Sequence, residues 1–240
     1  MRYIIADIHG CYNEYINLLK KINFSDNDIL YILGDVVDRG PEPIKILQDM
    51  MKRSNVFLII GNHEFMMYTI LKKLAVEITS ENCENYLDAD DILKYNLWLQ
   101  NGGYTTLKQF SNLSRDEKED ILDYIGDFSY YETINYNNKE YVLVHADLGN
   151  YSPYIKLGDY GLDEIIDHRA DYSKRYFQDT NKYLITGHAP TLHIPNWNKA
   201  EVYEKNGHIA IDCGCVCGGR LAAYCIETGK ATYVDGVKIK

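Results

Sequence analysis

Twelve residues near the N-terminus read Ile29-Leu30-Tyr31-Ile32-Leu33-Gly34-Asp35-Val36-Val37-Asp38-Arg39-Gly40, an apolar run that stops at a charged loop between glycines. The run is typical of a buried strand. Two other stretches follow the same pattern: Arg2–Ala6 leads into Asp7-Ile8-His9-Gly10, and Val56–Ile60 leads into Gly61-Asn62-His63-Glu64. Three such units predict strands that bring polar side chains to one edge of a sheet.

Helical spacing separates these strands, for example over Asn13–Ile22. Strand–helix–strand alternation favours parallel pairing and an α/β fold. Residues 64–128 are mainly helical in pattern, with breaks near Glu81–Asn85 and at Asn101-Gly102-Gly103, and we expect them to form a helical insert or cap within a single domain spanning residues 1–240. The last third returns to short strands, which predict a second, more antiparallel sheet: Tyr130–Asn135, Tyr141–Val144, Tyr183–Thr186, His208–Asp212, Leu221–Ile226 and Ala231–Val234.

Charge and hydropathy exclude several classes of protein. The 240 residues carry 25 Lys and Arg against 35 Asp and Glu, a net charge of −10. This balance argues against a general nucleic-acid binder, whose binding face is basic. The N-terminus has no secretory apolar segment, and the longest aliphatic runs are far shorter than the ~20 residues of a membrane span. We therefore expect a cytoplasmic protein with no nucleic-acid or membrane partner.

Five predicted strands end in residues that can ligate a metal: Asp7 and His9, Asp35, Asn62, His145 and His188. The carboxyl ends of strands in such sheets are where sites gather. Mixed His, Asp and Asn ligands without thiolate suit Mn, Fe or Zn. Six ligands exceed the needs of one tetrahedral metal, so we expect two divalent metal ions, with Asp35 able to bridge them.

A two-metal centre can hold the oxygens of a phosphoryl group for in-line attack. That chemistry also needs a proton donor and positive charge. His63 follows a ligand directly and must point elsewhere, so it is available for proton transfer. Arg39 and Arg169 can bind phosphoryl oxygens bidentately. Each cluster also has an ordinary interpretation: an Asp38–Arg39 ion pair, a helix cap at Asn62, or an acidic first-turn residue at Glu64.

Taken together, the motifs resemble the phosphoprotein phosphatase (PPP) family of calcineurin-like metallophosphoesterases. The likeness is to compact bacterial and phage serine/threonine phosphatases and the related symmetrical diadenosine tetraphosphatases. It continues through Val144-His145-Ala146, Arg169, Thr186-Gly187-His188-Ala189-Pro190-Thr191 and Ile211-Asp212-Cys213-Gly214 with Gly218-Gly219-Arg220-Leu221. It implies a four-layer α/β sandwich, two mixed sheets flanked by helices.

The resemblance also implies roles. Asp7, His9 and Asp35 would hold one metal, and Asp35, Asn62, His145 and His188 the other. His63, oriented by Asp38, would protonate the leaving alkoxide, while Arg39, Arg169 and Asn62 bind the phosphate. A hydroxide held by the two metals would attack directly, without a phosphoenzyme.

Some residues depart from the family pattern or stay outside the predicted site. Ala6 replaces a usual glycine, Asp147 replaces the glycine of His-Ala-Gly, and Asp167 stands where a tryptophan often precedes the family arginine. Cys213, Cys215 and Cys217 are expected to be small buried residues rather than half of a metal site. We expect His168, His193 and His208 to be structural or exposed.

The expected function is metal-dependent hydrolysis of phosphomonoesters, foremost phosphoserine and phosphothreonine in proteins, with phosphotyrosine left open. The enzymatic alternative is symmetrical hydrolysis of diadenosine tetraphosphate on the same site. A remote alternative is an inactive binding module that keeps the fold, but inactive relatives usually lose ligands and all are present here. A nuclease fits the acidic charge poorly.

Overall fold

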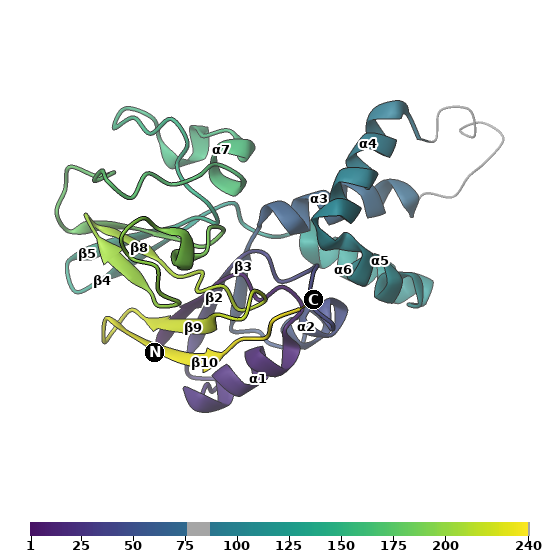
Figure 1. Ribbon diagram of the computed structural model, residues 1–240, viewed down its shortest axis with the longest axis horizontal. Helices are drawn as coiled ribbons and strands as arrows, with labels where there is room; N and C mark the ends of the chain where they lie inside the picture. Colours follow the sequence, from purple (N-terminus) through teal and green to yellow (C-terminus); the bar gives the residue numbers. More distant parts are fainter. Residues whose placement is uncertain (76–86, 240) are drawn as a thin grey trace.

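The computed structural model describes residues 1–75 and 87–239, which form two five-stranded sheets (Figure 1). In the first sheet β1 (Arg2–Ile5), β2 (Ile29–Leu33) and β3 (Val56–Ile59) pair in parallel, and β9 (Arg220–Cys225) and β10 (Lys230–Asp235) extend it antiparallel from β1. The second sheet has the order β4-β5-β6-β8-β7 and is also mixed. Its strands are β4 (Glu132–Tyr136), β5 (Lys139–Leu143), β6 (Lys182–Thr186), β7 (Tyr203–Lys205) and β8 (His208–Ala210).

The two sheets pack face to face, because both faces of their central strands are apolar. Along β1, Ile4 lies in the cluster between the sheets, whereas Ile5 joins the cluster under the helices. Along β5, Tyr141 and Val142 alternate in the same way, as the period of two in a strand requires. Helices α1 (Tyr12–Lys21) and α2 (Pro43–Met50) cover the first sheet, and α7 (Leu162–Ile166) with its flanking loops covers the second (Figure 1). The predicted four-layer α/β sandwich is confirmed.

Among the described residues, four α-helices lie between β3 and β4 and extend to one side of the sheets (Figure 1). They are α3 (Asn62–Leu74), α4 (Ala89–Trp98), α5 (Tyr104–Ser111) and α6 (Arg115–Gly126). The predicted break at Asn101–Gly103 is a kink in the segment Leu99–Gly103, where Gly102 has a φ of 103°. The predicted break at Glu81–Asn85 lies outside the described residues.

The expectation of a second, more antiparallel sheet in the last third was wrong in two respects. That sheet has as many parallel as antiparallel pairings, and two of the expected strands are not part of it. The strands expected at Leu221–Ile226 and Ala231–Val234 belong to the first sheet, since β9 pairs with β1 through Tyr3 and Cys225. The second sheet contains instead a three-residue edge strand, β7, that the sequence pattern did not predict. An apolar pattern shows that a strand is buried but not which sheet it joins.

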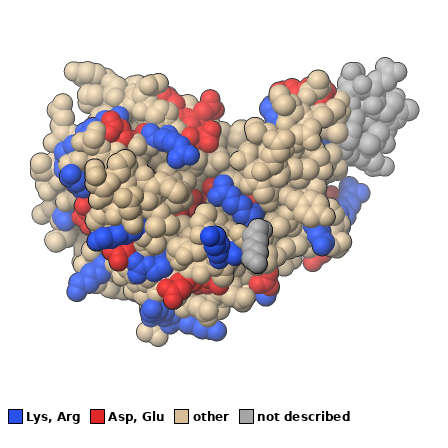
Figure 2. Space-filling model, viewed as in Figure 1, with Lys and Arg blue, Asp and Glu red and all other residues tan. Residues whose placement is uncertain are grey.

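Acidic and basic side chains are interspersed on the face seen in Figure 2, with no continuous basic stripe across it. Within the described part of the chain, no helix has both the length and the apolar character needed to span a bilayer.

Candidate metal centre

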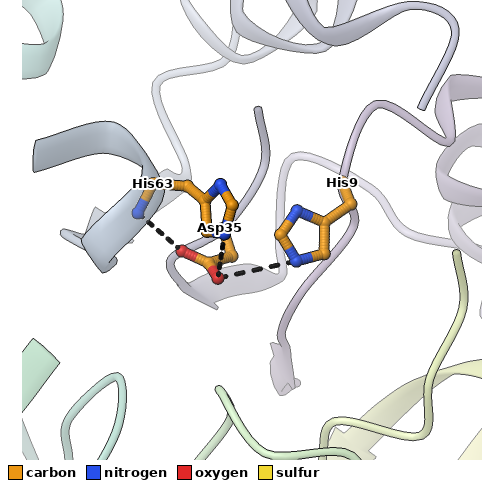
Figure 3. A group of neighbouring side chains, drawn as sticks. All are labelled: His9, Asp35 and His63. Carbon is orange, nitrogen blue, oxygen red and sulfur yellow. Dashed lines mark hydrogen bonds and ion pairs between the residues drawn. The ribbon is translucent and has the colours of Figure 1, made fainter. Parts of the chain in front are cut away.

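Asp35 directly follows β2 and stands among histidines from other loops. Its Oδ2 atom lies 3.5 Å from His9 Nε2 and 3.9 Å from His63 Nε2, and the backbone N–H of His63 donates to Oδ1 at 3.1 Å (Figure 3). All three residues are buried. This is one of two groups in the described residues whose ligand atoms lie close enough together to hold a metal ion.

The second group shares Asp35 and adds His145 and His188. His145 Nε2 lies 3.4 Å from Asp35 Oδ1 and 3.1 Å from Asn62 Oδ1. Asn62 Oδ1 is in turn 3.2 Å from His188 Nδ1. These residues follow β2, β3, β5 and β6, so the parallel strands do bring them to one rim.

The hydrogen bonds around the cluster fit a cation. Nδ1 of His145 donates to the carbonyl of Leu33 at 2.6 Å, and Nδ1 of His9 donates to that of Val37 at 2.9 Å. A carbonyl can only accept, so in the neutral rings each Nε2 carries a lone pair. The lone pair of His145 therefore faces oxygens of Asp35 and Asn62, and such a set of acceptors calls for a cation between them.

Electrostatics within the cluster lead to the same conclusion. Burial raises the pKa of Asp7 well above its usual range, and the charges of Asp212 and Asp35 raise it further. Burial opposes ionisation of Asp35 too, but the charges of His145, His63 and the other histidines outweigh it and lower the pKa of Asp35. Buried like charges are costly without a counter-ion. Burial likewise lowers the pKa of His9.

Asp7 lies beside these two groups rather than within either of them. Both of its carboxylate oxygens accept the backbone N–H of His188, at 3.1 and 2.9 Å. Neither Asp7 nor His9 continues the extended strand before it, because β1 ends at Ile5 and both residues are left-handed, with φ of 53° and 43°.

The residue expected to donate a proton is held by the carboxylate expected to orient it. His63 Nδ1 lies 2.7 Å from Asp38 Oδ2, and both side chains are buried. Burial disfavours the charged ring, but Asp35 and the hydrogen-bonded Asp38 outweigh that effect and raise the pKa of His63.

The two predicted phosphate-binding arginines are both exposed. Arg39 donates from Nη1 to His9 Nε2 at 2.8 Å and from Nη2 to His63 Nε2 at 2.9 Å. A metal on His9 would use the same lone pair, so that hydrogen bond and metal binding exclude each other. Arg169 lies near enough to the second group for its charge to act on His188. Burial lowers the pKa of His188 to about 3, and the charges of His145 and Arg169 contribute to this shift.

Backbone conformation singles out the same residues. In the described residues, every non-glycine residue with positive φ is either an asparagine or one of the candidate site residues. Those site residues are Asp7, His9, Asp35, Asp38, Arg39 and His188. Left-handed backbone is uncommon for any residue other than glycine and costs of order 1–3 kcal/mol, and such strain concentrates at functional sites.

Glu64 anchors the loop after β2, a role that its position in a first helical turn did not reveal. Its Oε2 accepts the backbone N–H of Asp35 at 2.7 Å and of Gly61 at 3.1 Å. Its Oε1 accepts those of Val36 at 2.8 Å and Val37 at 3.1 Å. Burial and the charge of Asp35 raise the pKa of Glu64 to about 7 despite these donors.

Three further residues were not predicted as parts of the site. Asp212 is buried, and its charge reaches Asp7. Trp98 and Thr106 hydrogen-bond to the carboxylate of Asp38. The sequence contained two signals for these residues: the motif around Asp212 and the glycine break after Trp98. Neither signal shows which residues Asp212, Trp98 or Thr106 contact.

The residues kept out of the predicted site have other surroundings. Cys213 and Cys215 are buried as expected, whereas Cys217 is exposed. No cysteine belongs to a candidate metal group within residues 1–75 and 87–239. The extra carboxylate, Asp147, is buried with Oδ2 at 3.2 Å from Nδ1 of the exposed His168.

Comparison with known proteins gives the chain its family. The family model for calcineurin-like phosphoesterases matches residues 3–192. Serine/threonine-protein phosphatase 2 of Salmonella typhimurium is 30% identical over 94% of this chain and 92% of its own length. The asymmetrical bis(5'-nucleosyl)-tetraphosphatase PrpE of Bacillus subtilis is 26% identical over 92% of this chain and 88% of its own length.

Other relatives match over a shorter region. The chain spans less than half the length of several symmetrical bis(5'-nucleosyl)-tetraphosphatases, such as 37% of that from Wigglesworthia glossinidia brevipalpis, at 39% identity over 103 residues. Among solved structures, a proposed diadenosine tetraphosphatase has the same fold, with a TM-score of 0.68 at 20% identity over 99% of this chain and 94% of that one. The chain belongs to the calcineurin-like phosphoesterases and, within them, to the phosphoprotein phosphatase (PPP) family.

Proposed function

We propose that this protein is a metal-dependent phosphomonoester hydrolase that acts on phosphoserine and phosphothreonine in proteins. In this proposal Asp7, His9 and Asp35 hold one divalent cation, and Asp35, Asn62, His145 and His188 hold a second. Manganese is the first choice of metal, with iron or zinc as alternatives, since the donors are histidine nitrogens and neutral or anionic oxygens. When bound, a pair of divalent cations lowers the pKa of a shared water and neutralises phosphoryl oxygens.

The observation that carries the proposal is the buried His63–Asp38 pair beside the cluster, joined at 2.7 Å. An alkoxide is a poor leaving group and needs a proton as the ester bond breaks. The pair supplies one once a phosphate draws Arg39 away from Nε2, which accepts from Arg39 Nη2 in this structure: Asp38 accepts from Nδ1, and Nε2 of the protonated ring then donates to the serine or threonine oxygen.

Positive charge for the phosphate comes from Arg39 and Arg169 in this account. Arg39 already reaches the Nε2 atoms of His9 and His63, so its guanidinium lies where a phosphoryl oxygen would approach the proton donor. Asn62 contributes its amide to the same pocket. The full-length match to a bacterial serine/threonine phosphatase supports this substrate class.

Hydrolysis of dinucleoside polyphosphates is the second candidate function. The match to the Bacillus relative supports it, and so does a cavity of about 520 Å³ whose lining includes Leu148, three residues after His145 in the sequence. Aromatic side chains of Tyr131, Tyr151 and Phe177 line this cavity and could stack on a nucleobase. A phosphoanhydride releases a nucleotide, which needs little protonation, so this substrate makes less use of His63.

The test is a parallel assay of the purified protein with manganese on a phosphoserine peptide, a phosphotyrosine peptide and diadenosine tetraphosphate. The proposal predicts a higher kcat/KM for the phosphoserine peptide, and no activity for Asp35→Asn on any substrate. A large preference for diadenosine tetraphosphate would establish the second candidate instead, and product analysis would separate symmetrical from asymmetrical cleavage. Inactivity on all three substrates with manganese, iron and zinc would favour the inactive binding module.

A further inference from the structure

We propose that the kinked connection between α4 and α5 positions the proton donor: Trp98 and Thr106 orient Asp38, and Asp38 in turn orients His63. The inference rests on the proposed function, because it assigns these two residues to the step in which the leaving alcohol is protonated. If the inference is correct, the helical insert (residues 64–128) helps to position the catalytic residues.

The contacts converge on one buried carboxylate. Trp98 Nε1 donates to Asp38 Oδ2 at 2.9 Å, the same oxygen that faces His63 Nδ1 at 2.7 Å. The hydroxyl of Thr106 donates to Oδ1 at 2.6 Å and accepts the backbone N–H of Asp38 at 2.9 Å. Asp38, Trp98 and Thr106 are each fully buried. A buried carboxylate needs such donors, and here two of the three that reach its oxygens come from the insert.

Two glycines let the insert come this close. A Cβ on Gly103 would lie 2.5 Å from the Trp98 indole, and one on Gly102 would lie 2.7 Å from Arg39 Cγ. The carbonyl of Gly102 accepts the backbone N–H of Arg39 at 3.0 Å. The lack of side chains at Gly102 and Gly103 therefore lets the indole pack against Asp38, and the Gly102 carbonyl adds a backbone hydrogen bond to Arg39.

The loop that receives these bonds is strained. Asp38 and Arg39 are consecutive left-handed residues, with φ of 67° and 61°. Such backbone persists only where surrounding contacts over-determine it. The bonds from Trp98, Thr106 and Gly102 are contacts of this kind, and they reach the loop from residues 60 or more positions away in the sequence.

Orientation matters because His63 has one productive arrangement. With Nδ1–H bound to Asp38, Nε2 faces Arg39 and the side of the cluster where a phosphoryl group would lie. If Asp38 turned, the ring would lose the partner that fixes its tautomer and direction. Outer partners that orient a metal-ligating histidine contribute about 10- to 100-fold to activity, and we take the same range for this oriented proton donor.

The test uses Trp98→Phe and Thr106→Val, with matched controls elsewhere in the chain. Trp197 Nε1 donates to the carbonyl of Glu201 at 3.2 Å, and Thr69 donates to that of Phe65 at 2.8 Å, so Trp197→Phe and Thr69→Val remove equivalent groups without touching Asp38. Turnover is measured with manganese on a phosphoserine peptide and on p-nitrophenyl phosphate, whose leaving group needs little protonation. We expect about a 10- to 100-fold loss on the peptide and a clearly smaller loss on the aryl ester for both test variants, and near wild-type rates on both substrates for the controls.

A double-mutant cycle separates positioning from general damage. If Trp98 acts through His63, adding Trp98→Phe to His63→Asn should cost little further activity on the peptide. Equal losses on both esters, or full additivity in the cycle, would overturn the inference, and Thr106→Val supplies the answer if Trp98→Phe fails to fold. Whether the variants support or overturn the positioning role, the proposed function stands if the wild-type protein hydrolyses the peptide. If the wild-type protein is inactive on both monoesters, the proposed function is refuted and this inference with it.

Discussion

Replacing Glu64 with glutamine tests whether one carboxylate holds the loop after β2 in place. Glu64 is fully buried, and its two oxygens accept four backbone N–H groups at 2.7 to 3.1 Å, three of them from Asp35, Val36 and Val37. Glutamine keeps the shape but has only one accepting oxygen. Its NH₂ group must then face two N–H donors, which are left buried without a partner.

Each buried unsatisfied donor costs about 1–3 kcal/mol, so Glu64→Gln should lose roughly 2–6 kcal/mol of the free energy of unfolding. For a chain of this size, a 4 kcal/mol loss lowers the midpoint of thermal unfolding by about 8–16 °C. The measurement is urea and thermal unfolding at pH 8, above the pKa of about 7, so that the wild-type carboxylate is mainly ionised.

Glu117→Gln is the matched control, because Glu117 accepts similar bonds from Ser114 in an exposed capping box. It should change the midpoint far less. Manganese affinity should also fall in Glu64→Gln, since Asp35 lies in the loop that Glu64 holds. If Glu64→Gln unfolds within about 2 °C of wild type, the anchoring argument is wrong.

Three further changes address the cluster and the core. His63→Asn should reduce turnover on a phosphoserine peptide by about 10²–10⁴, with a smaller loss on aryl phosphates; equal losses on both ester types would remove the proton-donor role. Asp35→Asn should lower both bound metal, measured by elemental analysis, and rate, whereas the exposed Asp26→Asn should lower neither; full metal retention in Asp35→Asn would contradict bridging. Burial lowers the pKa of His208 to about 4, below the ~6.5 of the unfolded chain, so the neutral ring stabilises the fold above pH 6.5 and up to roughly 3 kcal/mol is lost as pH falls to 4. His208→Gln should flatten the decline in unfolding free energy over that window, and an unchanged slope would argue against this linkage.

The strand ends were predictable because an apolar run followed by glycine and polar residues is a local signal. The pair Asn137-Asn138 is also a local signal, because asparagine tolerates left-handed backbone. Both residues adopt it in the tight hairpin between β4 and β5. Local pattern did not reveal which sheet β9 joins, since its residues are buried in either arrangement.

The finer structure of the site depends on contacts between distant residues. Asp7 and His9 leave the extended conformation right after β1, and only the assembled site can stabilise such backbone. Trp98 and Thr106 meet Asp38 across 60 and 68 residues of sequence. The sequence indicates a break at Gly102-Gly103, but it does not indicate which side chain the break brings to which loop.

Two cations bridged by Asp35 are the centre of the proposed mechanism. The most direct measurement is an anomalous difference map from crystals grown with manganese. The account predicts two peaks roughly 3.5–4 Å apart, one beside His9 and one beside His145 and His188, with Asp35 between them. A map with no peak at this rim, or with a single peak that Asp35 does not contact, would contradict it.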